Sequence, residues 1–365
     1  MTVGAGDRRG DKSRGGEPLA APCVAGGVPR RTAGAGIVGH SAGTAIRRRG
    51  VMAGALLSTL PRLGRAADCP ALPPPHHGPI FDAAVQAWNP QVQGLLDALP
   101  GSGVRRVAWF ADSHAGREVT AYVVQAAARA HPDLVVLGAP KIGFIRGGDL
   151  PPGYVADTIT GVRSGLYRFI GEILYSHADK PDNRPTPGGV VYVDPLAPGT
   201  ARLLAGIKDH SVPLMTHWEA WNWQRDLPRF DQLYATWPQQ IFVLSSLAYG
   251  SPDKADRLLS AHPNLWATIS HVVDGRYRFV DPAKQAMLGP PMIDDCGTLR
   301  PDWRAVLLKY ADRLMFASDA HPTGHVGWDV YPHIIGRYRR IAAQLPPAVA
   351  QRISWDNAAS LYGMR

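Results

Sequence analysis

Histidine and acidic side chains recur in this chain at the ends of short apolar runs. His217 lies at the end of VPLMTHW, and Asp319 ends RLMFASD. Imidazole and carboxylate groups that converge can hold a divalent ion, which lowers the pKa of bound water to about 7, or they can transfer protons themselves. A single histidine at a strand end is more often a hydrogen-bonded rim residue, but several on different strands favour a reactive site. The polar residues in such positions are Gln86, Asp112, His114, Lys141, Glu172, His217, His271, Asp319 and His321.

The apolar runs predict buried parallel strands, because they are almost continuously apolar rather than alternating. Segments with helical spacing, such as 117–130, lie between them. Eight strands with intervening helices predict an α/β fold, a (β/α)8 TIM barrel, in which the carboxyl ends of all strands form one rim. A doubly wound open sheet would need a glycine-rich phosphate turn after an early strand, and the sequence has none. The predicted strands are 78–86, 104–112, 133–140, 168–175, 212–218, 240–246, 264–271 and 313–319.

The chain divides into an N-terminal segment, 1–67, and a barrel domain, 68–365. Residues 46–67, IRRRGVMAGALLSTLPRLGRAA, follow the basic, apolar, small-residue order of an export signal, and their paired arginines resemble a twin-arginine signal. We therefore expect a periplasmic or secreted protein. The apolar run is too short for stable membrane insertion, since about 20 residues span a bilayer. The alternative is a basic, disordered N-terminus, as residues 1–45 suggest by composition, followed by a short helix.

The net charge of +9 belongs almost entirely to the N-terminal segment. Residues 1–67 hold 11 Arg and Lys residues and 3 acidic residues, so they carry +8 and the remaining chain carries +1. A basic leader says nothing about what the barrel binds, so the charge does not indicate nucleic acid as a partner. The predicted partner is a small-molecule substrate, and the sequence leaves open whether the chain forms a homo-oligomer.

The chain has three cysteines, Cys23, Cys69 and Cys296. Cleavage near Ala67 would leave the last two, which in an oxidising compartment could form one disulfide between the N-terminal tether and a late loop. The alternative is two unrelated thiols. The spacing of the cysteines matches no metal site.

Several segments resemble the amidohydrolase-related barrels, in order along residues 79–365. GPIFDAAVQAWNP is similar to the family's opening Pro-Ile-Phe-Asp-Ala-His-x-His, and ISWDNAASLYG is similar to its closing pattern. The Gly171-Glu172 step, the strand of His217 and RLMFASD fit between them. The resemblance implies a TIM barrel that hydrolyses amides, esters or lactones with a bound metal, although some members decarboxylate aromatic acids.

The family's ligands carry over only in part. The strand-five histidine matches His217, the strand-eight aspartate, a ligand and proton acceptor, matches Asp319, and the strand-four acidic position matches Glu172. The strand-one His-x-His instead falls on Ala84 and Gln86. Ser246 stands where the strand-six histidine is expected. Alanine cannot bind a metal, and glutamine and serine are weak zinc ligands.

Three interpretations of this departure stay open. A divalent metal, zinc or manganese, could be held in a rebuilt site by Glu172, His217 and Asp319, with Asp112, His114, His177, His271 or His321 from neighbouring strands. The metal could be lost, leaving a metal-free acid/base set of Asp319, His217 and Lys141, or a catalytically inactive barrel that binds a small ligand or a partner protein. A serine hydrolase using Ser245 or Ser246 would lack the Gly-x-Ser-x-Gly elbow.

The predicted substrate contacts are Gln86, Lys141, Trp218, His271 and His321. Tryptophans near the predicted rim suit stacking on an aromatic or sugar-like substrate, although core packing and subunit interfaces use tryptophan as often. Purely structural roles are the alternative for the charged residues as well. Asp319 could cap the loop after strand eight, and Glu172 could pair with Lys141 or Arg168.

Overall fold

A computed structural model describes most of the predicted barrel domain. The described residues are 69–87, 92–112, 117–143, 145, 148–177, 191–273, 288–322 and 327–363. They all belong to one compact unit, Gly64–Arg365. The predicted export signal, 46–67, and the segment before it lie outside the described residues, as does His114.

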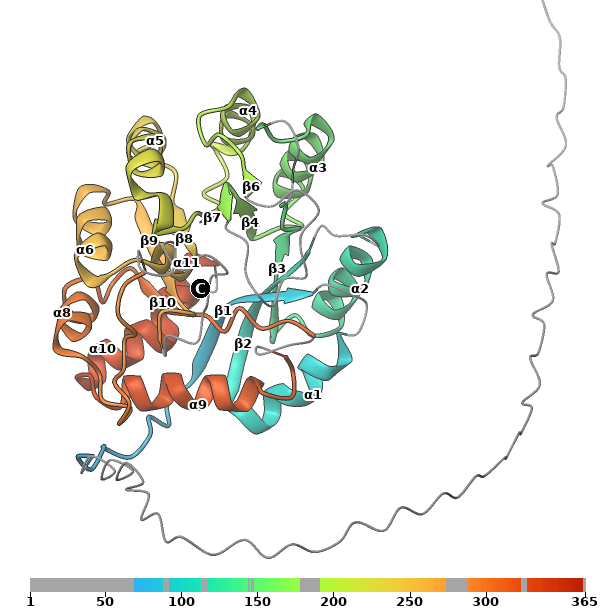
Figure 1. Cartoon of the computed structure of the whole chain (residues 1–365). Helices are drawn as coiled ribbons and strands as arrows, with labels where there is room; N and C mark the ends of the chain where they lie inside the picture. Colours follow the sequence, from blue (N-terminus) through green and yellow to red (C-terminus); the bar gives the residue numbers. More distant parts are fainter. Residues whose placement is uncertain are drawn as a thin grey trace, which may run out of the picture. The chain divides into compact units, whose positions relative to one another are not determined.

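Eight parallel strands form a nearly closed barrel, which confirms the fold predicted from the apolar runs (Figure 1). A bridge between Val85 and Ala320 joins the first strand to the segment just after the last one, and the amide of Gln86 donates to the carbonyl of Ala320 at 2.8 Å. Each strand overlaps one predicted run. In sheet order the strands are β1 (Ile80–Ala87), β2 (Val104–Ala111), β3 (Val135–Ala139), β4 (Phe169–Leu174), β7 (Leu214–His217), β8 (Phe242–Leu244), β9 (Leu265–Ile269) and β10 (Leu314–Phe316).

Helices surround the strands and connect them (Figure 1). In the described part of the chain, no helix is long and apolar enough to cross a membrane. A short antiparallel pair, β5 (Ser176–His177) and β6 (Val191–Tyr192), follows β4. The helices are α1 (Gln93–Ser102), α2 (Arg117–Ala130), α3 (Pro152–Arg163), α4 (Pro198–Ile207), α5 (Trp223–Thr236), α6 (Pro252–Ala261), α8 (Pro301–Lys309), α9 (Tyr331–Ala342), α10 (Pro347–Gln351) and α11 (Asn357–Leu361).

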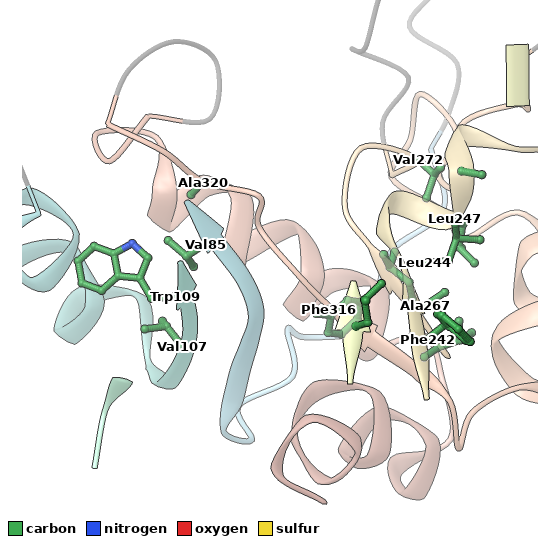
Figure 2. Close-up of a cluster of buried hydrophobic side chains, with 14 of the residues drawn as sticks. Val85, Val107, Trp109, Phe242, Leu244, Leu247, Ala267, Val272, Phe316 and Ala320 are labelled. Atoms are coloured by element: carbon green, nitrogen blue, oxygen red, sulfur yellow. The ribbon is translucent and has the colours of Figure 1, made fainter. Parts of the chain in front are cut away.

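The strands bury one set of side chains against the helices and another inside the barrel. Figure 2 shows the outer set on two groups of strands, with Val107 and Trp109 on β2 and Phe242 and Leu244 on β8. Because successive side chains of a strand point to opposite faces, this outer set alternates with an inner set. Burial of each large apolar side chain contributes about 1.5–3 kcal/mol. This two-sided burial explains why the strands are almost continuously apolar.

The inner apolar set closes one end of the barrel. Tyr362, just after α11, packs against Phe169 with a ring-centroid distance of 4.9 Å and against Phe81 at 5.7 Å. Its hydroxyl donates to the carbonyl of Ala83 at 3.1 Å. Phe81 and Phe169 lie near the amino ends of β1 and β4, so the C-terminal helix covers that end. The polar side chains that could form an active site therefore lie at the carboxyl ends of the strands.

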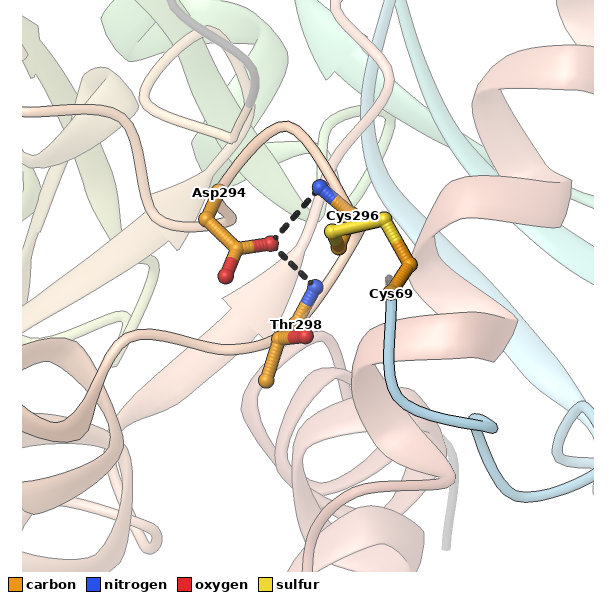
Figure 3. Close-up of a disulfide and its surroundings, with 4 residues drawn as sticks. All are labelled: Cys69, Asp294, Cys296 and Thr298. Carbon is orange, nitrogen blue, oxygen red and sulfur yellow. Dashed lines mark hydrogen bonds between the residues drawn. A yellow bond between two sulfur atoms is a disulfide. The ribbon is translucent and has the colours of Figure 1, made fainter. Parts of the chain in front are cut away.

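A disulfide joins Cys69 to Cys296, the first of the two alternatives for these cysteines (Figure 3). Their Cα atoms are 5.4 Å apart, within the usual range for a disulfide. Asp294 orders the loop around Cys296, because its Oδ1 accepts hydrogen bonds from the amides of Cys296 at 2.9 Å and Thr298 at 2.8 Å. The bond ties the start of the described chain to the loop before α8.

Candidate active site

Polar side chains form a layer directly above the inner apolar set. In several strands a polar residue stands two positions after an inward apolar one, so the two point the same way. Because of this alternation, the polar residues at the carboxyl ends of the strands all point inward and form a rim. TIM barrels carry their active sites at this end. The pairs are Ala84 and Gln86, Phe110 and Asp112, Met215 and His217, Val243 and Ser245, and Ala317 and Asp319.

Glu172 joins this layer through an irregularity in β4. The register between β4 and β7 shifts between Ile170 and Ile173. Gly171 lies in this stretch against the main chain of the neighbouring strand, because a Cβ atom there would lie 2.2 Å from the carbonyl oxygen of Ala139. The Gly171-Glu172 step therefore has a structural reason, which is a close approach of two strands that only glycine permits. The side chain of Glu172 is fully buried within the rim.

Lys141 connects three strands through an ion pair and a hydrogen bond. Its ammonium nitrogen lies 2.5 Å from Oε2 of Glu172 and donates to Oε1 of Gln86 at 3.0 Å. Burial lowers the pKa of Lys141, but the carboxylates of Glu172, Asp112 and Asp319 outweigh burial, so the pKa lies above its ordinary value. Lys141 is therefore a permanent positive charge. Of the two structural alternatives for Glu172, pairing with Lys141 or with Arg168, the structure shows the pair with Lys141.

Asp319 is held on both of its carboxylate oxygens. Oδ1 accepts a hydrogen bond from Nε2 of Gln86, and Oδ2 accepts one from Nε2 of His271 at 2.7 Å. Burial raises the pKa of Asp319, but the hydrogen bond and charge of His271 outweigh burial and lower it. The backbone of Asp319 has φ of 53°, a left-handed conformation that costs energy in most residues and is common at functional sites.

A left-handed turn after β8 places an aromatic ring between two rim histidines. Residues 246–249 all have positive φ values, from 49° to 55°. The turn ends at Tyr249, whose ring centroid lies 5.7 Å from that of His271 in a stacked arrangement and 5.8 Å from that of His217. Four consecutive non-glycine residues in this conformation represent stored strain beside the rim.

His177, His217 and Glu219 form a buried cluster that could hold a metal ion. One ligand atom from each lies within 4.8 Å of the others. Nε2 of His217 is 3.1 Å from Oε1 of Glu219, and its other ring nitrogen, Nδ1, donates to Oε1 of Glu172 at 2.7 Å. A carboxylate that fixes the second ring nitrogen is typical of metal-binding histidines. Two histidines and one carboxylate are a known zinc ligand set that leaves a position open for substrate.

The charges around His217 support one another. Burial raises the pKa of Glu172, but the charges of Lys141 and His217 hold it well below its usual range. Burial also lowers the pKa of His217, yet Glu172 and Glu219 together raise it above its ordinary value. Ser245 adds a hydrogen bond at 2.7 Å from its hydroxyl to Oε1 of Glu172. Glu172 is thus a buried anion whose two oxygens orient Lys141 and His217.

The structure brings together most residues predicted from the sequence, and it shows the contacts of Trp218 and Glu172. Trp218 is fully buried, stacks on Phe230 with a centroid distance of 4.7 Å, and donates to the hydroxyl of Tyr234 at 3.2 Å. The ring of Trp218 therefore packs against α5, because successive residues along a strand face opposite sides. Glu172 supports His217 rather than joining the three-residue cluster.

The remaining predicted residues have simpler outcomes. Asp112 is buried at the end of β2, and His321 is buried just after the bridge that joins β1 to the end of β10. Ser246 shares a hydrogen bond of 2.5 Å with the hydroxyl of Ser270. Among the described residues, neither Ser245 nor Ser246 is hydrogen-bonded to a histidine, so the serine-hydrolase alternative gains no support.

Glu219 is a candidate ligand that the sequence predictions did not include. The sequence contains a signal for Glu219. His217 and Glu219 are two residues apart at a strand end, so their side chains can face the same way. The family pattern instead predicts ligands on strands one and eight. His177 was named only as one of several neighbours.

A family model described as amidohydrolase matches residues 98–364. The chain belongs to the amidohydrolase family. Its members are hydrolases that typically depend on a metal ion. The match covers most of the barrel, so the resemblance seen in the sequence is confirmed. No curated protein matches the chain.

Solved structures share the barrel at low sequence identity. An uncharacterised TIM-barrel protein from Bordetella bronchiseptica is 13% identical, with a TM-score of 0.51, and the match covers 79% of this chain and all of that one. N-isopropylammelide isopropylaminohydrolase from Burkholderia multivorans is 16% identical, with a TM-score of 0.44 over 74% of this chain and 62% of that one. A 5-methylcytosine deaminase from Klebsiella pneumoniae is 15% identical, with a TM-score of 0.44 over 76% of this chain and 65% of that one. These likenesses concern the fold alone.

Two parts of the rim differ in whether their residues fit the metal ion that the family implies. At the strand-one and strand-eight position the residues do not fit, because Ala84 offers no ligand atom and Gln86 is hydrogen-bonded to both Lys141 and Asp319. At the end of β7 they fit, because His177, His217 and Glu219 supply nitrogen and oxygen atoms that converge. The chain therefore combines the family's barrel with a candidate metal site at the end of β7.

Proposed function

We propose that this protein is an exported amidohydrolase that cleaves a carbonyl-type bond, an amide, ester or lactone, in a small molecule. A divalent ion, zinc or manganese, would be held by His177, His217 and Glu219. The observation that carries this proposal is the convergence of these three buried side chains at the carboxyl end of the barrel strands. In a site with three protein ligands, such an ion polarises a carbonyl group and activates water.

The residues around this cluster have separable roles. Glu172 holds the ring of His217 through Nδ1, so Nε2 is the nitrogen that faces Glu219. Lys141 neutralises Glu172 and keeps that carboxylate ionised. Across the rim, Asp319 holds His271 through Nε2, so His271 is placed to accept or return a proton during cleavage. The fixed positive charge of Lys141 favours negative charge that develops on a substrate oxygen.

Metal content tests the proposal most directly. The purified protein would be reconstituted with zinc or manganese, desalted and measured by elemental mass spectrometry, followed by hydrolysis assays on panels of amides, esters and lactones. We expect stoichiometric metal that His177→Ala and Glu219→Gln both remove. His210→Ala is the matched control, because His210 is exposed and lies beyond α4. No metal in the unaltered protein would contradict the proposal and favour a barrel that only binds a ligand.

The export part of the proposal rests on residues 46–67 and gains support from the disulfide. Structural disulfides are typical of oxidising compartments. Cys69 lies just after the predicted cleavage point near Ala67, so the mature chain would keep both cysteines of this disulfide. N-terminal sequencing of the mature protein should find a start near residue 68. Replacement of Arg48 and Arg49 by lysine should retain the uncleaved precursor in the cytoplasm, and unchanged export would contradict a twin-arginine route.

A further inference from the structure

One half of the rim contains a cation that belongs to the chain itself. This half consists of Gln86, Asp112, Lys141, Glu172, His271 and Asp319. Lys141 is 7% exposed, and its ammonium group lies among acidic side chains from three other strand ends. Its nitrogen contacts Oε2 of Glu172 at 2.5 Å and Oε1 of Gln86 at 3.0 Å. Asp112 and Asp319 act on it at longer range through their charges. Two or more buried carboxylates require a nearby cation, and here a lysine supplies it.

The side-chain amide of Gln86 bridges Lys141 and Asp319 in this half of the rim. Gln86 accepts from Lys141 with its carbonyl oxygen and donates to Asp319 with its amide nitrogen. Asp319 uses its other oxygen for His271. A glutamine is suited to this position because it carries both an acceptor and a donor. A histidine at the same place could not bridge a lysine and an aspartate in this way while also binding a metal.

We infer that the ammonium group of Lys141 is the resident cation of this half of the rim, in the place where the strand-one and strand-eight residues of the family hold a metal ion. Asp319 then acts as a positioning residue for His271 and is not a metal ligand. The inference goes beyond the proposed function, because it concerns a second location in the rim and depends on neither the substrate nor the cluster at β7.

Removal of Lys141 should convert this half of the rim into a metal site. The carboxylates of Glu172 and Asp319 would lose the ammonium group that lies between them, although each keeps its histidine partner. Together with Oε1 of Gln86 they would offer oxygen ligands, which prefer hard cations such as manganese. The test uses a His177→Ala background, which silences the cluster at β7. We expect the thermal midpoint of this single variant to be the same in manganese chloride and in a chelator.

In the same background, Lys141→Ala should lower the midpoint in the chelator and manganese should restore it. Lys141→Arg keeps the charge and should show no such rescue. Lys309→Ala is a second control, because Lys309 is exposed and its loss breaks a surface ion pair with Asp256 and a contact with the ring of Tyr310. A Lys141→Ala protein whose midpoint is indifferent to manganese would overturn the inference, because its carboxylates would then need no cation.

A second measurement does not depend on the stability of the Lys141 variants. Asp319→Asn, made in the otherwise unaltered protein, should leave the metal content unchanged. It should also shift the ring nitrogen nuclear magnetic resonance signals of His271, because the carboxylate oxygen that accepts the hydrogen bond from its Nε2 is replaced. Metal content that falls in Asp319→Asn would make Asp319 a ligand and overturn the inference. Loss of metal in His177→Ala tests the proposed function separately, so the two failures are distinguishable.

Discussion

Asp82 offers a quantitative test of how the barrel is closed. This fully buried carboxylate on β1 accepts hydrogen bonds from the amide of Ser318 at 2.8 Å and the hydroxyl of Tyr331 at 2.8 Å, so it joins β1 to the end of β10 and to α9. Burial raises the pKa of Asp82 from 3.8 to about 6, although these hydrogen bonds oppose the shift. The folded protein therefore binds this proton more tightly than the unfolded chain does.

The sign of the pH dependence follows from this difference. Since the folded state holds the proton and the unfolded state releases it, the free energy of unfolding falls as the pH rises between about 4 and about 6. A shift of about two pKa units corresponds to about 3 kcal/mol. Asp82→Asn keeps the shape of the side chain and an acceptor for Ser318, but it has no charge to bury. Relative to the unaltered protein, the variant should therefore gain about 3 kcal/mol between these two pH values.

Urea titrations of both proteins at several pH values from 4 to 8 would measure this gain. The difference between the two free energies of unfolding cancels the contribution of every other titrating group. Tyr331→Phe is the matched control, because it keeps the carboxylate and removes one hydrogen bond that stabilises its charged form. That variant should move the transition to higher pH. A difference between Asp82→Asn and the unaltered protein that stays constant with pH would refute this reasoning.

Four further substitutions probe the scaffold. Cys296→Ser opens a disulfide that spans 227 residues, and the chain-entropy model gives a loss of up to about 5 kcal/mol, to be measured by denaturant titration without reductant; a midpoint equal to that of the oxidised protein would contradict this. Gly171→Ala should lower the free energy of unfolding by about 1–3 kcal/mol, because its Cβ would meet the carbonyl of Ala139. Gly153→Ala in α3 has open space around the new Cβ and should raise the free energy of unfolding by about 0.4–1 kcal/mol. The reverse order of the two effects would refute the packing argument. Asn357→Ala should cost about 1–3 kcal/mol in thermal or urea unfolding, because its amide donates to two buried carbonyls beside β10 at 2.7 and 2.8 Å; a neutral result would mean that other donors replace it.

The fold was largely predictable because its strands are buried on both faces. The continuous apolar runs marked all eight strands, and Asn357 belongs to a closing pattern whose role is to bond the turn before β10. The pairing of Lys141 with Glu172 was also among the predicted alternatives. These features depend on local spacing and on the requirement that buried charges be paired, both of which a sequence displays.

The choice among the rim residues was made by the tertiary structure. The sequence by itself determined that histidines and carboxylates gather at the carboxyl ends of parallel strands. It did not determine that Trp218 turns into the core, that a strand irregularity at Gly171 brings Glu172 inward, or that Lys141 lies among the acidic groups. Each outcome depends on distances of a few ångströms between strands far apart in the chain, and the energies that decide them, desolvation and charge pairing, change steeply over those distances.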